Sequence, residues 1–421
     1  MPTIPADRVE TLPKIPGRAL AFCFALILAA VSMRAIAEES YKLGVALGFT
    51  GTGKSYSQEA LRGIELAVDE INAMGGLLGK HRIELIVENT RTNAEIAGKV
   101  ARKLVERDAV RAVIGTYSSA SALAIKPILR DARVLHIATV SNSEDITKLE
   151  FSPYTFSVVP NTYMMSKALV VGAAGLARQN GWKTYVTVAS DYAWGRSNQE
   201  IQVSLMTELA PGVKLIGSYW PPLGEKAFNA FIVGTIKLAP DFILASLAGS
   251  DNEYWMRDGR DYGLFRRIPS PGALISLVEL ERDAKLMPRG IYGRTRAPFF
   301  AHLDVPMMKA FVDAYRARHD RYPSDWAVMS YDGVHALRQG VEAAGDIDNE
   351  GVRAALTGAT IETTRGRHTF REIDNQLSVS AYFGRIGDDP VYPFPIYVDL
   401  TELKGPDIWR PTAEIRAARA R

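Results

Sequence analysis

A glycine-rich loop followed by lysine and serine is the segment of this chain whose residue types most directly suggest chemistry. Residues 48–55, GFTGTGKS, match the pattern with which P-loops bind nucleotide phosphates. In such a loop the backbone N–H groups surround the phosphates and the lysine, here Lys54, reaches them. The apolar run before the loop predicts a strand, and the amphipathic run after it predicts a helix, as the motif requires. Taken alone, the loop predicts nucleotide hydrolysis.

The amino-terminal residues argue against that chemistry, because 1–37 have the layout of a secretory signal peptide. Basic residues come first, an apolar run of about 15 residues follows at 19–33, and Ala35-Ile36-Ala37 forms a small-x-small cleavage site. The run is shorter than a bilayer span requires, so we expect cleavage near Ala37 and not the alternative, an uncleaved anchor. An exported chain meets almost no ATP. We therefore interpret Lys54 as a solvated loop residue and keep a P-loop ATPase as the less favoured alternative.

Composition and motifs exclude several other classes. The chain has 50 Lys+Arg and 47 Asp+Glu, and residues 1–37 carry four of the positive and two of the negative side chains, so the exported part is near +1. That balance predicts no binding to nucleic acid. The single cysteine, Cys23, lies in the signal, so disulfides and thiol chemistry are not expected. The six histidines lack zinc-ligand spacing, and no nucleophile–base set is recognisable. We expect no enzyme activity, no metal and no cofactor.

Strands and helices alternate along the first part of the chain. On the first helix, Leu61, Ile64, Val68 and Ile71 share one face, which predicts packing on a sheet. The next elements are predicted as strands 83–88, 110–115 and 134–140, with helices over 93–107 and 119–131. The strands are continuous apolar runs, which is typical of parallel strands covered on both faces. Helical crossovers between parallel strands predict a doubly wound sheet.

The pattern breaks at residues 154–160, and a second alternating series begins near Lys183. Its strands are predicted at 184–191, 213–220, 240–249, 272–277 and 289–296, followed by helices over 304–318 and 326–344 and an extended tail. The expected fold is α/β, with two doubly wound parallel-sheet lobes joined by a multi-strand hinge. The expected division is a signal at 1–37, lobe 1 at 38–159 and 293–379, and lobe 2 at 160–292 and 380–421.

These segments resemble a known family. The opening loop ends in Thr50-Gly51, and residues 62–76 carry the signature RG-x-x-LAVDEIN-x-x-GG. Both features are similar to those of the extracytoplasmic solute-binding proteins of the branched-chain amino acid (Leu/Ile/Val-binding) ABC transporter family. Further similarity runs in order through almost all of the exported chain, at 110–127, 134–147, 155–161, 186–197 and 329–337. The resemblance implies a type I periplasmic binding fold, in which a ligand binds between the lobes.

The resemblance also implies which loops contact the ligand. One loop of lobe 1 would supply hydroxyl and backbone N–H groups to a carboxylate, and a second loop and an aromatic side chain would complete that wall. In lobe 2, a tyrosine after the first strand and a later glycine-containing loop would face them. Transferred to this sequence, the ligand-binding residues are Tyr56, Tyr117, Ser118, Ser119, Val140, Ser141, Asn142, Tyr192, Trp194, Ala248 and Gly249. A plain N-cap for the serines and loop packing for the aromatic residues are the alternatives.

The solute and the partner follow from the same resemblance. The acid that holds an ammonium group in amino-acid binders is not in its usual place, and Asp251, Glu253 and Glu279 are the candidate substitutes. The solute class therefore stays open among an amino acid, an amide and an organic, including aromatic, acid. The expected role is the periplasmic solute-binding component of an ABC importer, a monomer that delivers its solute to an inner-membrane permease. The alternative is an extracytoplasmic clamp that reports the ligand to a signalling receptor.

Overall fold

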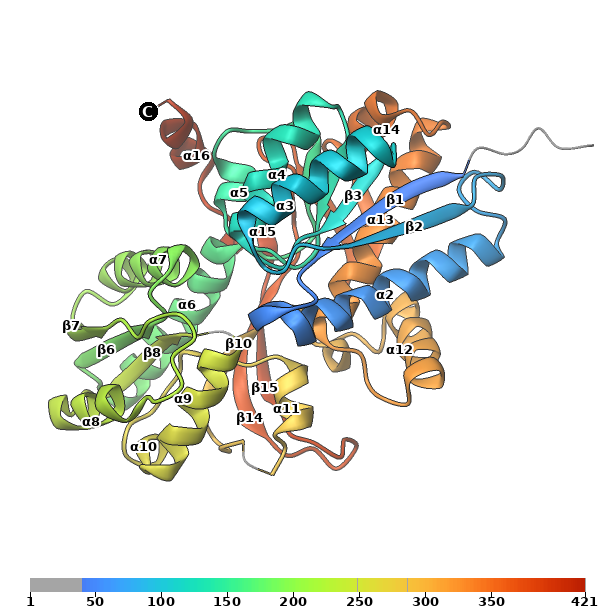
Figure 1. Ribbon diagram of the computed structural model, residues 1–421. Coiled ribbons are helices and arrows are strands. Elements are labelled where there is room, and N and C mark those ends of the chain that lie inside the picture. Colours follow the sequence, from blue (N-terminus) through green and yellow to red (C-terminus); the bar gives the residue numbers. More distant parts are fainter. Residues whose placement is uncertain (1–39, 248, 286, 421) are drawn as a thin grey trace, which may run out of the picture. The chain divides into compact units, whose positions relative to one another are not determined.

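The first sheet of the protein has eight strands. The structure is a computed structural model and describes residues 40–247, 249–285 and 287–420, so the predicted signal peptide lies outside the described residues. The strand order is β11-β12-β13-β5-β4-β3-β1-β2, and Figure 1 labels β1, β2 and β3 of this sheet. The parallel strands of this sheet are β1 (Tyr41–Leu47), β2 (Ile83–Asn89), β3 (Ala112–Gly115), β4 (Leu135–Ala138) and β5 (Thr155–Ser157).

Three short strands from late in the chain extend the same sheet beyond β5. They are β11 (Thr360–Thr363), β12 (Gly366–Arg371) and β13 (Gln376–Leu377). β13 pairs in parallel with β5, whereas β11, β12 and β13 pair with one another in antiparallel fashion. The sheet therefore combines strands that are more than 200 positions apart in sequence, such as Ser157 and Gln376.

Helices pack on both faces of this sheet. Alternate strand residues point to opposite faces, and the apolar clusters follow that rule. Leu43 and Val45 of β1 share a buried cluster with residues of α2 (Lys54–Ala73) and α13 (Asp325–Ala344). Ala46 lies in a separate cluster with residues of α3 (Ala94–Arg102) and α4 (Ser119–Asp131). This two-sided burial explains why the strands are continuous apolar runs.

A second sheet has three parallel strands in the order β7-β6-β8. They are β6 (Thr184–Ala189), β7 (Lys214–Tyr219) and β8 (Phe242–Ser246). One face packs on α6 (Thr162–Asn180) and α7 (Ala193–Leu209) through Tyr185 and Phe242. The other face, which includes Val186 and Ile243, packs with α8 (Asn229–Leu238) and α9 (Ser250–Asp261). The α/β class predicted from the alternating patterns is confirmed.

The strand expected at 272–277 does not extend this second sheet. Only β9 (Ala273–Leu274) forms, and it pairs with β10 (Tyr292–Thr295) in a third sheet of order β15-β14-β10-β9. The third sheet also contains β14 (Ala381–Gly387) and β15 (Ile396–Leu403), both antiparallel to their neighbours. The apolar run is cut short because Ser276 and Glu279 form a capping box that starts α11 (Leu277–Arg282).

Shorter helices complete the described chain. They are α5 (Asp145–Lys148), α10 (Leu264–Arg267), α12 (Pro306–His319), α14 (Asn349–Leu356), α15 (Gly405–Ile408) and α16 (Thr412–Arg419), with single turns η1 (Gly51–Gly53), η2 (Lys103–Arg107) and η3 (Phe299–Ala301). Within the described residues, none of the helices combines the length and the apolar character needed to cross a bilayer.

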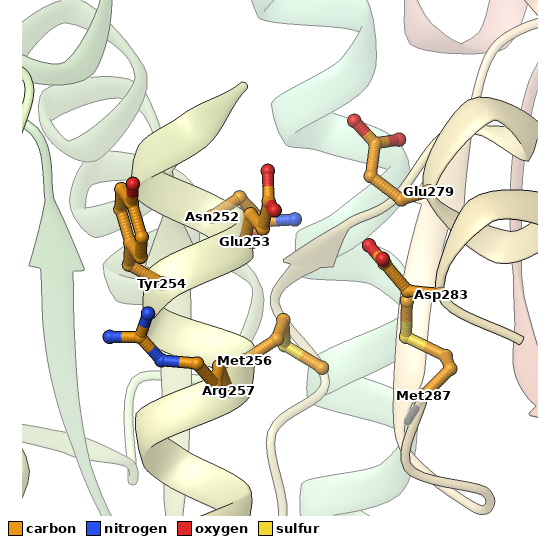
Figure 2. Close-up of a pocket in the computed structure, with 8 residues that line it drawn as sticks. All are labelled: Asn252, Glu253, Tyr254, Met256, Arg257, Glu279, Asp283 and Met287. Atoms are coloured by element: carbon orange, nitrogen blue, oxygen red, sulfur yellow. The ribbon is translucent and has the colours of Figure 1, made fainter. Parts of the chain in front are cut away.

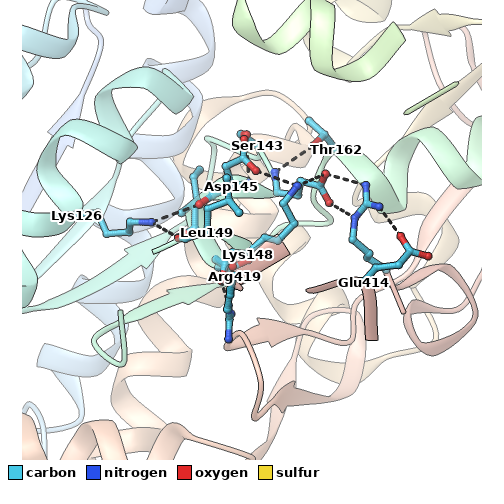
Figure 3. Close-up of polar contacts among 12 residues, drawn as sticks. Lys126, Ser143, Asp145, Lys148, Leu149, Thr162, Glu414 and Arg419 are labelled. Carbon is cyan, nitrogen blue, oxygen red and sulfur yellow. Dashed lines mark hydrogen bonds and ion pairs between the residues drawn. The ribbon is translucent and has the colours of Figure 1, made fainter. Parts of the chain in front are cut away.

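The carboxyl-terminal segment is tied to the loop that follows β4. Both carboxylate oxygens of Glu144 accept hydrogen bonds from Arg410, at 2.6 and 2.8 Å, and Lys148 also pairs with Glu144 at 2.8 Å. Arg419 of α16 donates to two backbone carbonyls of α5, and Figure 3 shows this network. The network fixes α5, which follows directly on the predicted ligand loop 140–142.

Candidate ligand-binding cleft

A cavity of about 710 Å³ lies beside the first turns of α2. One wall comes from η1 and the first turns of α2, and the other from the loops after β7 and β8 and from α9 and α11. The residues that line it are Gly51, Thr52, Lys54, Ser55, Tyr56, Gln58, Gly224, Lys226, Gly249, Ser250, Glu253, Tyr254, Glu279 and Arg282. The cavity thus adjoins the carboxyl ends of β1, β7 and β8, where ligands bind in open α/β sheets.

A smaller cavity of about 90 Å³ adjoins this one between α9 and α11. Figure 2 shows Glu253 on α9 facing Glu279 on α11 and Asp283 directly after that helix, with the thioethers of Met256 and Met287 beside them. Arg282 partly balances the acids, since it pairs with Glu253 at 3.1 Å and also with Asp283. The two cavities share Glu253 and Glu279, so the smaller one is a side extension of the larger.

Tyr56 links the two walls of the cleft. Its hydroxyl accepts a 3.1 Å hydrogen bond from the backbone N–H of Gly249 and donates to the carboxylate of Glu279. Burial raises the pKa of Glu279, although hydrogen bonds from Ser276 and Tyr56 act in the opposite direction. Burial, together with the neighbouring Glu279, raises the pKa of Tyr56 well above its usual value. Two residues predicted from different parts of the sequence, Tyr56 and Gly249, are therefore in direct contact.

Tyr117 packs beside Tyr56 and explains one glycine of the P-loop-like motif. The two ring centroids are 5.7 Å apart, and burial raises the pKa of Tyr117 to about 12. A Cβ atom at Gly53 would lie 2.3 Å from the Tyr117 ring. Gly53 is thus required because a side chain at this position would clash with the Tyr117 ring. In a P-loop, by contrast, glycine allows the backbone to come close to a phosphate.

Three other backbone groups of this loop form hydrogen bonds within the protein. The N–H of Gly48 donates to Ser57 Oγ, and the N–H of Phe49 donates to Asn89 Oδ1, both at 3.0 Å. The carbonyl of Thr50 accepts from Thr92 Oγ1 at 2.9 Å, and Lys54 is exposed. The N–H groups of Gly48 and Phe49 are thus directed at side chains of the protein.

The predicted loops after β3 and β4 lie side by side. Ser118 is the N-cap of α4 and accepts from Ser121 N–H at 3.4 Å, and Ser119 Oγ accepts from Ser143 N–H at 3.1 Å. Both are acceptors in these bonds, so their hydroxyl hydrogens can still be donated. Val140, Ser141 and Asn142 are buried, and the N–H of Ser141 bonds to Thr116 O at 2.8 Å. Their contact with a ligand stays a prediction.

The predicted aromatic pair after β6 faces the loop after β4. Tyr192 and Trp194 lie at the start of α7 with ring centroids 5.9 Å apart, and the indole N–H of Trp194 donates to Asn142 Oδ1 at 3.2 Å. Burial and the nearby Tyr117 raise the pKa of Tyr192 well above its usual value. The structure thus brings the tyrosines 56, 117 and 192 near one another, whereas Ala248 lies outside the described residues.

Sequence reasoning missed a charged pair behind the tyrosines. Arg296 follows β10 and is 3% exposed, and its guanidinium lies over the Trp326 ring, 4.6 Å from the centroid. The nearest approach to the carboxylate of Asp325 is 4.0 Å. Burial raises the pKa of Asp325 to about 7 and lowers the pKa of Arg296, so for both groups burial outweighs their mutual attraction. The sequence offered one signal for a charged group here, because Arg294 and Arg296 lie at the end of an apolar strand, in the segment GRTR.

The chain is similar to known proteins along most of its length. The model of a family described as periplasmic binding protein matches residues 40–390. The leucine-, isoleucine-, valine-, threonine- and alanine-binding protein of Pseudomonas aeruginosa is 25% identical over 348 residues, which cover 83% of this chain and 90% of that protein.

Two solved structures share the fold. A periplasmic binding protein from Burkholderia mallei superposes with a TM-score of 0.80 at 19% identity, covering 91% of this chain and 100% of the other. An ABC transporter solute-binding protein from Rhodopseudomonas palustris BisB5, in complex with 3,4-dihydroxybenzoic acid, gives a TM-score of 0.77 at 21% identity, covering 89% and 99%. At these identities the likeness concerns the fold.

Proposed function

This chain belongs to the periplasmic binding protein family, and from that premise we propose that it is the solute-binding component of an ABC importer. The observation that carries the proposal is the cavity of about 710 Å³ whose opposite walls are joined through Tyr56. A concave site with aromatic walls and a few directed polar groups is typical of small-molecule binding. Within the described residues, no group of histidine, cysteine and acidic side chains is placed to hold a metal ion.

The solute is a small amino acid, amide or organic acid that binds between two lobes. The lobes are residues 38–159 with 293–379, and residues 160–292 with 380–421. The Pseudomonas aeruginosa relative is named for five amino acids, and the Rhodopseudomonas palustris structure holds an aromatic acid. The first wall comprises Tyr56, Tyr117 and the loops at 118–119 and 140–142, and the second comprises Tyr192, Trp194 and Gly249.

Binding couples to closure of the two lobes. The bonds from Tyr56 to Gly249 and Glu279, and from Trp194 to Asn142, join residues that belong to different lobes in this division. They exist only when the lobes are together. A solute that contacts both lobes favours the closed state by the difference between its affinities for the two states. The closed protein then delivers the solute to an inner-membrane permease.

The protein acts in the periplasm as a monomer, after removal of a signal peptide near Ala37. Peptide mapping of the protein from the periplasmic fraction would test this. The expected amino terminus lies close to Glu38, and an intact Met1 on protein bound to the membrane would contradict it.

Thermal unfolding in the presence of candidate solutes tests the function itself. Amino acids, their amides and aromatic or aliphatic acids should be compared at equal concentration. A ligand at 100 times its Kd stabilises the folded state by about 2.7 kcal/mol. At least one class should raise the melting temperature. Failure of every class, together with the absence of any co-purified small molecule by mass spectrometry, would contradict the proposal.

A further inference from the structure

Arg296 is a buried cation that lacks the hydrogen bonds buried arginines normally make. A guanidinium has five N–H donors. In the part of the chain that the structure describes, Arg296 donates no hydrogen bond, its Nε is fully buried without a partner, and Asp325 is 4.0 Å away. Arg365, by contrast, donates to Asp332 and to Val158 O, both at 3.0 Å. A buried charge with so few hydrogen bonds is destabilising, so the guanidinium of Arg296 has donors to offer to a partner that the protein itself does not supply.

Arg296 is connected to the cleft through a short series of aromatic contacts. It lies over Trp326, the Trp326 ring is 4.9 Å from that of Tyr56, and Tyr56 lines the large cavity. Arg296 also interacts electrostatically with Tyr56, Tyr117 and Glu279. It therefore lies one contact layer behind the cleft wall. A solute would contact it only if the bonds of Tyr56 to Gly249 and Glu279 break and the rings of Tyr56 and Trp326 move aside.

The acids that could hold an ammonium group are already engaged. Glu279 accepts hydrogen bonds from Tyr56 and from the N–H and Oγ of Ser276. Asp251 accepts from Ser190 Oγ at 2.6 Å and from Gly224 N–H at 3.0 Å, and Glu253 pairs with Arg282. Asp325 makes a loose ion pair with Arg296 at 4.0 Å, and both of its carboxylate oxygens are buried without a hydrogen-bond partner. The cluster thus offers a positive group for an anion, but each of the three acids proposed for an ammonium group already has partners.

We infer that the solute is a carboxylic acid without an amino group, and that its carboxylate binds the guanidinium of Arg296 in place of Asp325. The inference rests on the proposed function. A carboxylate matches the planar guanidinium in a bidentate geometry that a neutral amide cannot reproduce. Asp325, whose pKa is raised, can take up a proton when the solute carboxylate replaces it. The rings of Tyr56, Tyr117 and Trp326 suit an apolar or aromatic body.

The test uses matched probes on the exported protein. Benzoate is compared with benzamide, and 4-methylpentanoate with its amide and with L-leucine, by calorimetry and thermal unfolding. For wild type, at least one acid should bind, and its amide and its amino derivative should bind at least tenfold more weakly. Arg296→Met should weaken the acid by at least about 30-fold, the lower range for loss of one partner in a buried charge pair. Arg296→Lys should recover part of the affinity.

Two controls separate binding from folding. Arg385→Gln removes a cation that pairs with Asp399 away from the cavity lining and should change affinity by less than about threefold, because its partly exposed charge is screened by solvent. Ligand-free protein with Arg296→Met and Asp325→Asn together should melt at or above the wild-type temperature, because both members of a loose buried charge pair are removed. A structural arginine would instead lower it.

The outcomes distinguish the two proposals. Preference for an amide or for leucine over the matched acid, or an Arg296→Met variant that binds the acid within threefold of wild type, overturns the carboxylate inference and leaves the binding function intact. If no probe binds and no solute co-purifies, the binding function fails, and the inference fails with it.

Discussion

The backbone N–H of Gly249 donates a 3.1 Å hydrogen bond to the hydroxyl of Tyr56, 193 positions earlier in the chain. The same hydroxyl donates to Glu279, so one phenol joins α2 to the loop after β8 and to α11. If the lobes move apart, both bonds must break. Tyr56 is therefore a sensitive position at which to test whether contacts across the cleft stabilise the closed state.

Tyr56→Phe removes both hydrogen bonds while keeping the ring. We expect a loss of about 1–2 kcal/mol in stability, because the N–H of Gly249 and the buried carboxylate of Glu279 each lose a partner. We also expect solute to dissociate faster, which stopped-flow fluorescence would measure. Tyr254→Phe is the matched control, since Tyr254 lines the same cavity and its hydroxyl makes no hydrogen bond in the described residues. Equal dissociation rates in the two variants would show that the bond does not hold the cleft closed.

The pH dependence of stability should change on substitution of Asp325. Burial raises its pKa to about 7 from an ordinary value near 4, and Arg296 opposes the rise while Glu279 adds to it. Between about pH 4 and 7 the folded state thus holds a proton that the unfolded state has released. This group's contribution makes stability highest below pH 4 and lower as pH rises toward 7.

Asp325→Asn should remove that part of the pH dependence. The difference in unfolding free energy between variant and wild type should grow in favour of the variant from pH 5 to pH 7.5, by about 1.4 kcal/mol for each pKa unit of the shift. Urea unfolding at several pH values measures it. Asp388→Asn is an exposed control that should give a nearly constant difference. A constant difference for Asp325→Asn as well would contradict the raised pKa.

Gly53→Ala should disturb the cleft wall. The new Cβ would lie 2.3 Å from the Tyr117 ring, so the ring has to move, and overpacking of this kind costs about 1–3 kcal/mol. We expect weaker solute binding as well, because Tyr117 packs against Tyr56. Gly175→Ala, in α6 with open space around it, should instead be neutral or stabilising by up to about 1 kcal/mol. Unchanged affinity in Gly53→Ala would exclude Tyr117 from the ligand contacts.

Glu144→Gln should loosen the carboxyl-terminal segment. Arg410 and Lys148 would lose their common anion, and we expect a loss of roughly 2–4 kcal/mol, somewhat below that for a fully buried pair because Arg410 is partly exposed. Glu414→Gln also removes a partner of Arg410, but Glu414 is half exposed, so it should cost less than about 1 kcal/mol. Hydrogen exchange in α16 would report the release. Equal stability losses in the Glu144→Gln and Glu414→Gln variants would show that the burial of Glu144 does not strengthen its ion pairs.

Local patterns in the sequence were enough to predict the alternating elements and the α/β class. Periodicity placed Ile64, Val68 and Ile71 on the buried face of α2, and the helix expected at 119–131 is α4. These predictions succeed because the burial of neighbouring residues follows the repeat of the helix or strand that contains them. They fail at residues 272–277, where the Ser276–Glu279 capping box, a local helix-start motif inside the apolar run, ends the strand early.

The candidate site divides in the same way. The resemblance to a known family was needed to nominate Tyr56, Tyr117 and Tyr192, and sheet geometry agrees with it, since loops at the ends of parallel strands meet at one edge of a sheet. Only the tertiary structure revealed that Glu279 contacts Tyr56 and that Arg296 lies over Trp326 near Asp325. Whether a buried charge has a partner depends on groups brought together from distant segments, and no local pattern records that. The sequence determined the helices and strands and the edge of the sheet at which their loops meet. Tertiary packing decided that Arg296 lies behind the cleft wall at that edge.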